Sequence, residues 1–221
     1  MGEIQGDNNL VKTALIAGST GLVGAQLLQL LLASDRYGKV IAITRKELSP
    51  HHKLIQHQSD GETLLLDPTW RIDDTYCCLG TTIGKARSKE KFYHVDFTYP
   101  YELAKKSLEL GARQFLIVTA LGAQKNSPVY YNRVKGEIEE ALLKLEWNSL
   151  HILRPSLLLG DRNEKRTGEE AAKIFYRIFG FIIPKKYKAI ESAKVARAML
   201  HFASLDKHGK FIHESEELQD F

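Results

Sequence analysis

Short apolar runs alternate along the chain with longer segments in which apolar residues recur at helical spacing. The apolar runs predict strands, at Leu10–Ala17, Lys39–Thr44, Asp74–Leu79, Gln114–Thr119 and Ser149–Leu153. Weaker strand candidates are Lys53–Gln58 and Thr63–Leu66. The segments with helical periodicity predict helices, at Gly21–Ala33, Phe92–Leu110, Tyr130–Leu145 and Ser192–Ser204.

This alternation is typical of βαβ units and of a parallel sheet that helices cover on both faces. The runs ALIA, VIAI and FLIV are almost continuously apolar, as expected of strands that are buried on both sides. A chain of 221 residues has the length of one domain. We therefore predict an α/β fold, a doubly wound and mainly parallel Rossmann sheet, in a single domain over residues 1–221.

The pattern changes after Arg154 and Pro155. The next segments predict a charged loop, a helix and a short strand, at Asp161–Thr167, Glu169–Phe179 and Tyr187–Ile190. We expect residues from about 156 to 221 to form a small C-terminal lobe that folds over the carboxyl edge of the sheet and contacts the substrate.

Composition narrows the class of protein. Apolar residues make up 43% of the chain and charged residues 26%, which argues against a disordered or fibrous protein. The net charge of +4 is small and scattered, so we expect no nucleic-acid partner. Cys77 and Cys78 are neighbours that cannot close a loop, which favours a reducing compartment.

Neither a leader nor a metal site is expected. The N-terminal residues carry no basic region, and the longest apolar stretches are too short to span a bilayer. The histidines, among them His51, His52 and His57, lack the spacing of metal ligands. We therefore expect a cytoplasmic protein without a membrane span or a metal.

A glycine-rich loop joins the first predicted strand to the first predicted helix. It follows the pattern G-x-x-G-x-x-G and consists of Gly18, Ser19, Thr20, Gly21, Leu22, Val23 and Gly24. The first glycine permits a tight turn, the second lets the backbone approach a pyrophosphate, and the third lets the helix pack on the strand. The N-terminus of the helix then offers free N–H groups to phosphates. The alternative is a plain glycine-rich turn, but the position of the loop favours a dinucleotide site.

The end of the second strand bears on the choice of cofactor. An acidic residue about 20 residues after the glycine loop would hold the ribose hydroxyls of NAD. This chain has Thr44, Arg45 and Lys46 there instead. Because a guanidinium can bind a phosphate with two hydrogen bonds, Arg45 favours the 2′-phosphate of NADP(H) over NAD. The alternative is a solvated basic turn.

Tyr131 and Lys135 are spaced i, i+4 near the start of a predicted helix, which places them on one face. An ordinary tyrosine is a poor acid or base at neutral pH, but a nearby ammonium favours the phenolate. Such a pair can exchange a proton with a carbonyl or an alcohol. Tyr-x-x-x-Lys alone is common on surface helices. Here it follows a clear strand of a dinucleotide-binding pattern, and this context favours a catalytic pair.

Six motifs in order resemble one family: GSTGLVG, LGTT at 79–82, SKEKFYHVD at 88–96, VTALGA at 118–123, YNRVKGEIE at 131–139 and LRPSLLLG at 153–160. The chain resembles an atypical short-chain dehydrogenase/reductase over about residues 10 to 215. It is most similar to the NAD(P)-binding branch of Tat-interacting-protein-like oxidoreductases and small bacterial epimerase-like homologues.

The resemblance implies the residues that hold the cofactor. The glycine loop would bind the pyrophosphate, Arg45 the 2′-phosphate and Lys135 the nicotinamide ribose. The loop after the fourth strand would line the cofactor, through Leu79, Gly80, Thr81 and Thr82.

The resemblance also implies the catalytic residues. Tyr131 would donate or accept the proton, and Lys135 would tune it. The family's catalytic serine ends the fifth strand, where this chain has Thr119 and Ala120. Thr119 keeps a hydroxyl, but if the active hydroxyl belongs at the second position, Ala120 lacks it.

Two functions follow as hypotheses. The first is an NADP(H)-dependent oxidoreductase that transfers a hydride to or from a small carbonyl or alcohol substrate. The alternative is an NADPH-binding regulatory or redox-sensing protein without turnover, which the change at Thr119 and Ala120 favours. Epimerisation of a nucleotide sugar is a third hypothesis, although the chain is short for the substrate lobe of that class. A homodimer or another protein partner is left open.

Overall fold

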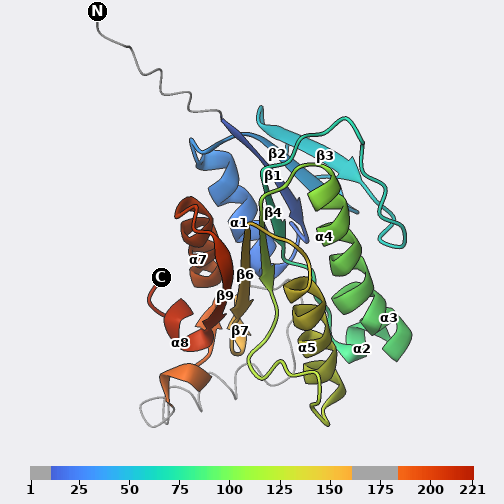
Figure 1. Cartoon of the computed structure of the whole chain (residues 1–221), viewed down its shortest axis with the longest axis vertical. Helices are drawn as coiled ribbons and strands as arrows, with labels where there is room; N and C mark the ends of the chain where they lie inside the picture. Colours follow the sequence, from blue (N-terminus) through green and yellow to red (C-terminus); the bar gives the residue numbers. More distant parts are fainter. Residues whose placement is uncertain (1–10, 161–183) are drawn as a thin grey trace, which may run out of the picture.

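The computed structural model describes residues 11–160 and 184–221, which form one seven-stranded sheet between two layers of helices (Figure 1). The strands of this sheet are β1 (Lys12–Ala17), β2 (Tyr37–Thr44), β3 (Leu54–Gln58), β4 (Asp74–Cys77), β5 (Gln114–Val118), β6 (Ser149–Arg154) and β9 (Gly209–Glu214). Their order is β3-β2-β1-β4-β5-β6-β9, and every neighbouring pair is parallel. The doubly wound parallel sheet predicted from the sequence is confirmed.

Helices cover both faces of the sheet (Figure 1). One layer holds α1 (Leu22–Ala33) and α7 (Ser192–Ser204), and the other holds α4 (Tyr99–Glu109) and α5 (Tyr130–Leu143). Ala14 and Ile16 of β1 face the first layer, whereas Leu15 and Ala17 face the second. Both faces of this strand are therefore apolar, which explains its continuous apolar run.

The remaining elements are short. They are α2 (Ile83–Ala86), α3 (Lys89–Tyr93), the π-helix η1 (His94–Thr98), β7 (Leu158–Leu159), the 3₁₀ helix η2 (Lys185–Tyr187), β8 (Ile190–Glu191) and α8 (Ser215–Leu218). The helix predicted over Phe92–Leu110 is thus built from the end of α3, from η1 and from α4. Pro100 lies in the first turn of α4, directly after η1, so the residue without an N–H falls where the π-helical turn gives way to the α-helix.

Some predicted strands differ from the structure. Thr63–Leu66 is irregular, and the strand expected at Tyr187–Ile190 is shifted to β8, which pairs with β7 in a separate two-stranded sheet. β9 was not predicted at all. It lies at the edge of the main sheet, where its side chains are only partly buried and its apolar signal is weak.

The C-terminal part of the chain contributes directly to the main layers. α7 packs with α1, and β9 extends the sheet beside β6. The predicted loop Asp161–Thr167 and helix Glu169–Phe179 lie outside the described residues. The small lobe thus stays a prediction for the segment between β7 and η2.

The strand order reverses between β1 and β4. From β1 the chain proceeds outward through β2 to β3, and from β4 it proceeds the other way through β5 and β6. In open α/β sheets ligands bind outside the carboxyl ends of the strands at this switch point. The loops that follow β1 and β4 therefore define the place to search for a site.

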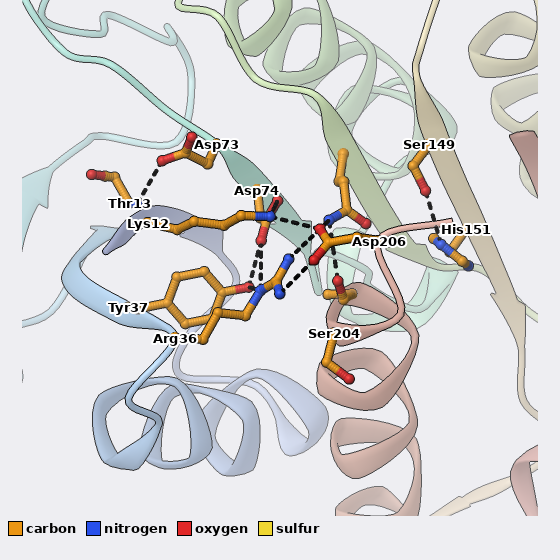
Figure 2. Close-up of polar contacts among 12 residues, drawn as sticks. Lys12, Thr13, Arg36, Tyr37, Asp73, Asp74, Ser149, His151, Ser204 and Asp206 are labelled. Carbon is orange, nitrogen blue, oxygen red and sulfur yellow. Dashed lines mark hydrogen bonds and ion pairs between the residues drawn. The ribbon is translucent and has the colours of Figure 1, made fainter. Parts of the chain in front are cut away.

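A polar network lies at the amino ends of the strands, opposite the carboxyl ends where a ligand would bind (Figure 2). The Tyr37 hydroxyl donates to Oδ2 of Asp74 at 2.6 Å, and Arg36 Nε lies 3.2 Å from the same oxygen. Asp206, in the turn after α7, accepts from Arg36 Nη2 and Lys12 Nζ at 2.6 Å each. The network therefore joins the beginnings of β1, β2 and β4 to the C-terminal part of the chain.

A second polar chain runs from β6 through β9 to α8. Ser149 Oγ lies 3.0 Å from His151 Nε2, and His151 Nδ1 lies 2.9 Å from His213 Nε2. His213 Nδ1 lies 3.0 Å from Oε2 of Glu217. Because the Glu217 carboxylate can only accept, each neutral imidazole must donate toward it, and the Ser149 hydroxyl donates to His151. Burial lowers the pKa of His151 to about 4.

Candidate functional site

The glycine loop is built around two close backbone contacts. Gly18 has φ +85°, and a Cβ there would lie 2.6 Å from the carbonyl carbon and oxygen of Cys78, at the end of β4. A Cβ at Gly24 would lie 2.0 Å from the Gly18 oxygen. Side chains at these two positions would collide with backbone, so glycine is required for β1, β4 and α1 to meet. Gly21 differs, because its φ of −81° is open to any residue.

The same loop leaves polar groups free at the start of α1. Gly21 is the N-cap of α1 and provides no side-chain hydrogen bond to it. The first N–H groups of the helix therefore lack intrahelical partners and point out of its positive end. Ser19 is buried, and its hydroxyl has no hydrogen-bond partner within the described part of the chain. These residues fit a dinucleotide pyrophosphate, which would take up the free donors.

Arg45 directly follows β2 and is exposed. Its side chain runs along Gly61, where a Cβ would come within 3.1 Å of Arg45 Cδ. Across residues 11–160 and 184–221, no hydrogen bond or ion pair engages its guanidinium. The structure therefore leaves Arg45 free to meet an anion beside the switch point.

Tyr131 and Lys135 both lie on α5, as the spacing predicted, but their surroundings differ. Tyr131 is half-buried against the Phe92 ring, with the ring centroids 5.7 Å apart. Lys135 is buried, and its Nζ lies 2.7 Å from Oδ1 of Asp96. Burial opposes the charge on Lys135, but the Asp96 carboxylate outweighs it and raises the pKa of Lys135 above its ordinary value.

Asp96 connects this pair to the loop after β4. Its second oxygen, Oδ2, accepts a hydrogen bond from the Thr81 backbone N–H at 3.0 Å. A Cβ at Gly80 would lie 3.5 Å from Lys135 Nζ and 3.6 Å from Asp96 Oδ1, so the ion pair lies directly beside Gly80. The predicted cofactor loop, Leu79 to Thr81, and Lys135 are therefore neighbours in the structure.

Asp96 received no role from the sequence, although it lies in the quoted motif SKEKFYHVD. A signal was present, because Asp96 shares the buried face of its helical segment with Phe92, Tyr99 and Leu103. An acidic residue on an apolar helical face requires a partner. The sequence did not indicate that this partner is Lys135.

Thr119 is engaged by a residue of α5 other than Tyr131 and Lys135. Its hydroxyl donates to Oε1 of Glu139 at 2.6 Å. Glu139 follows Tyr131 by eight residues on α5, which corresponds to about 12 Å along the helix. Arg154 holds both carboxylate oxygens of Glu139 through Nε, at 3.1 and 3.2 Å. The structure thus commits the Thr119 hydroxyl to a buried ion pair, and the catalytic role assigned to Thr119 stays a prediction that this geometry does not favour.

The sequence also led us to expect no metal site, and the described residues can be searched for one. Within the two described ranges, no group of three or more histidine, cysteine, aspartate or glutamate side chains could hold a metal ion. Nor does any helix of those ranges combine the length and the apolar character needed to cross a membrane.

A family model described as HIM1 matches residues 34–185, more than half of the chain. The chain belongs to the HIM1 family. This HIM1-family protein is 33% identical over 196 residues to protein HTATIP2 of Rattus norvegicus, covering 86% of this chain and 80% of the relative. The predicted resemblance to Tat-interacting-protein-like proteins is confirmed by this relative.

Fungal relatives correct the predicted location. The HIM1-family protein is 31% identical over 215 residues to "Protein FMP52, mitochondrial" of Lodderomyces elongisporus, covering 89% of each chain. It is also 37% identical over 160 residues to the Candida glabrata protein of the same name, covering 71% of this chain and 68% of the relative. The expectation of a cytoplasmic protein is therefore contradicted. That expectation rested on the polar N-terminal residues, the short apolar stretches and the two neighbouring cysteines, and none of these decides between the cytoplasm and mitochondria.

Solved structures share the fold at low sequence identity. The oxidoreductase ylbE from Lactococcus lactis matches with a TM-score of 0.62 and 18% identity, covering 95% of this chain and 96% of that chain. MoeE5, solved in complex with UDP-glucose and NAD, matches with a TM-score of 0.69 and 14% identity, covering 90% of this chain and 74% of that chain. These matches confirm the Rossmann-like architecture of the HIM1-family protein.

Proposed function

We propose that this protein is an NADP(H)-dependent oxidoreductase that transfers a hydride to or from a carbonyl or alcohol substrate. The observation that carries the proposal is the buried, charged Lys135 one helical turn from Tyr131, held beside Gly80 at the switch point of the sheet. A buried ammonium is costly to maintain, so its place beside the predicted cofactor loop indicates a role at that loop.

The cofactor follows from the glycine loop and from Arg45. The free N–H groups at the start of α1 and the unpartnered Ser19 hydroxyl would hold the pyrophosphate. MoeE5, which shares the fold, was solved in complex with NAD, and this supports a nicotinamide dinucleotide as the ligand class. The preference for NADP(H) rests on the exposed Arg45, since the turn at residues 44–46 contains no carboxylate.

Each residue has a distinct task in the proposed reaction. The bound nicotinamide supplies or accepts the hydride. Tyr131 Oη donates a proton to the substrate oxygen during reduction and removes it during oxidation. The Lys135 ammonium would donate hydrogen bonds to the ribose hydroxyls and so hold the nicotinamide near Tyr131. Gly80 and Thr81 line the cofactor beside it.

The second candidate is a protein that binds NADPH without turnover. The observation that favours it is the hydrogen bond from Thr119 to Glu139, together with Ala120 at the next position. No hydroxyl at the end of β5 is then directed toward the substrate oxygen, and a hydroxyl there would normally polarise it.

A titration and a turnover assay separate the two candidates. NADPH fluorescence is titrated with the protein, and NADPH consumption is then followed with a panel of aldehydes and ketones. Binding with consumption that is lost in Tyr131→Phe supports the oxidoreductase. Binding without consumption of any compound supports the second candidate, and an absence of binding contradicts both.

A further inference from the structure

We propose that Asp96 is a positioning residue that keeps Lys135 charged and fixes its ammonium beside the cofactor loop. The inference rests on the proposed function, because Lys135 receives its task at the nicotinamide ribose there. It adds a residue that the sequence did not assign and links the charge of Lys135 to the strength of nucleotide binding.

The geometry makes Asp96 a bridge between two elements. One oxygen of its carboxylate lies 2.7 Å from Lys135 Nζ on α5, and the other accepts the Thr81 N–H at 3.0 Å after β4. The side chains of Lys135 and Asp96 are only 5% and 0% exposed, so water screens the pair little. A single carboxylate therefore sets the position of the ammonium relative to the loop at residues 79–81.

The fold presents Asp96 from a wide helical turn. Asp96 lies in the π-helix η1, between α3 and α4, and η1 packs against α5. Single π-helical turns inside α-helices are frequent at functional sites. Here the turn puts an acidic side chain on the same buried face as Phe92 and Tyr99.

Asp96 is the group that supplies the countercharge. The other titratable groups that face Lys135 are Tyr131 on its own helix and Cys77 on β4. Burial raises the pKa of Cys77 to about 12, so its thiol is neutral at physiological pH. Without Asp96, the largest influence that opposes burial is lost, and burial favours the neutral amine.

Asp96→Asn separates charge from shape. The amide is nearly isosteric, and its oxygen can still accept the Thr81 N–H. The uncompensated Lys135 should then lose its proton at a lower pH than in the wild type. Because a charged donor binds more strongly than a neutral one, the NADPH affinity of the variant should fall roughly tenfold or more between about pH 7 and pH 9. The wild-type affinity should change little over that range.

Two measurements test the proposal. NADPH titrations at pH 7, 8 and 9 compare the wild type, Asp96→Asn and the control Asp73→Asn. Asp73 also accepts a backbone N–H, from Thr13 at 2.8 Å, but at the opposite edge of the sheet. In nucleotide-free protein, ¹³C-lysine NMR follows Lys135 Cε, which is assigned by its loss in Lys135→Met.

The outcomes distinguish this inference from the proposed function. A lower titration midpoint of Lys135 in Asp96→Asn, with the control unchanged, supports the inference; a midpoint equal to that of the wild type overturns it. A wild type that binds no dinucleotide contradicts the proposed function, while the NMR titration still decides whether Asp96 keeps Lys135 charged. If Asp96→Asn fails to fold, Asp96→Asn with Lys135→Met removes the unpaired ammonium. Recovery of folding then supports the inference, and failure of the double variant overturns it.

Discussion

Thr119 donates its hydroxyl hydrogen to Glu139 across 2.6 Å, and both side chains are buried. The carboxylate is shared with Arg154, which also reaches Glu214 at 2.9 Å. Hydrogen bonds with Glu139 raise the pKa of Arg154, so this cation keeps its charge at any physiological pH. The end of β5 is thereby fixed to α5, β6 and β9.

This contact predicts that Thr119 acts mainly on stability. Thr119→Val removes a hydrogen bond to a buried charged acceptor and should lower the free energy of unfolding by about 1.5–3 kcal/mol. Thr119→Ser keeps the hydroxyl and should lose much less. Urea denaturation measures both, and NADPH affinity should stay within about twofold of the wild type. If Thr119→Val instead keeps full stability but loses turnover, the result contradicts this prediction and supports a catalytic role for the Thr119 hydroxyl.

Tyr131→Phe should lower turnover by about 10²–10⁴-fold, because it removes the group that exchanges the proton and little else. NADPH affinity should be nearly unchanged, since the phenol is not expected to bind the nucleotide. Tyr130→Phe is the matched control: Tyr130 is the neighbouring residue, and its hydroxyl donates to the backbone oxygen of Lys89. Equal turnover of the two variants, on a substrate that the wild type accepts, would remove Tyr131 from the mechanism.

Arg45→Ala should weaken NADPH binding by roughly tenfold to a hundredfold and leave NADH binding almost unchanged. The cause is the loss of a guanidinium that can hold the 2′-phosphate with two hydrogen bonds. Titration of both nucleotides against both proteins measures the change. The neighbouring Lys46→Ala serves as a control for general charge. Equal affinity of the wild type for the two nucleotides would contradict the NADP(H) preference.

Gly21→Val and Gly24→Ala should fail in different ways. Gly21 already has a φ that valine can adopt, and a Cβ there meets its nearest neighbour, the Gly18 oxygen, at 3.3 Å. The protein should therefore fold and lose nucleotide binding, because the side chain occupies the approach to the pyrophosphate. A Cβ at Gly24 would lie 2.0 Å from that oxygen, so Gly24→Ala should destabilise the fold itself. Circular dichroism melts measure the effect on stability, and NADPH titrations measure the effect on binding. If Gly21→Val binds NADPH as the wild type does, the glycine loop is a turn without a role in nucleotide binding.

Stability should fall in mild acid because of His151. Its pKa is lowered to about 4 by burial first, and then by the charges of His213 and Lys207. The unfolded chain therefore binds the proton more readily than the folded chain does, so the neutral form stabilises the fold at neutral pH. That contribution should be complete above about pH 6.5 and lost progressively as the pH falls to about 4, by about 2–3 kcal/mol in total. Urea denaturation at several pH values from 7 to 4 measures the free energy of unfolding. This free energy should fall less with decreasing pH in His151→Phe than in the wild type. In the control His208→Gln, at an exposed position, it should fall as much as in the wild type.

The elements predicted correctly are those whose burial leaves a local pattern. β1 packs helices on both faces, so its run of apolar residues identified a central strand without knowledge of its neighbours. The glycine loop was found for a similar reason, because close backbone contacts at Gly18 and Gly24 require glycine in the sequence itself. The spacing of Tyr131 and Lys135 was readable because one helix carries both.

The features that were missed depend on pairings between distant segments. The ion pair between Asp96 and Lys135 joins η1 to α5, and no periodicity of either segment encodes it. The hydrogen bond from Thr119 to Glu139 could not be foreseen either, because the two residues become neighbours only when α5 packs on β5. β9 lacked a strong signal because an edge strand needs few apolar residues.

The network of Lys12, Arg36, Asp74 and Asp206 has a consequence for the order of folding events (Figure 2). Lys12 and Asp206 are 194 positions apart, so the contact between them closes nearly the whole described chain. Contacts of such long range require an unfavourable loop closure and form late. Substitutions at Asp206 should therefore accelerate unfolding while leaving the refolding rate nearly unchanged. Asp206, which connects the turn after α7 to the first strand, would then control how long the native protein persists, with little influence on how quickly it forms.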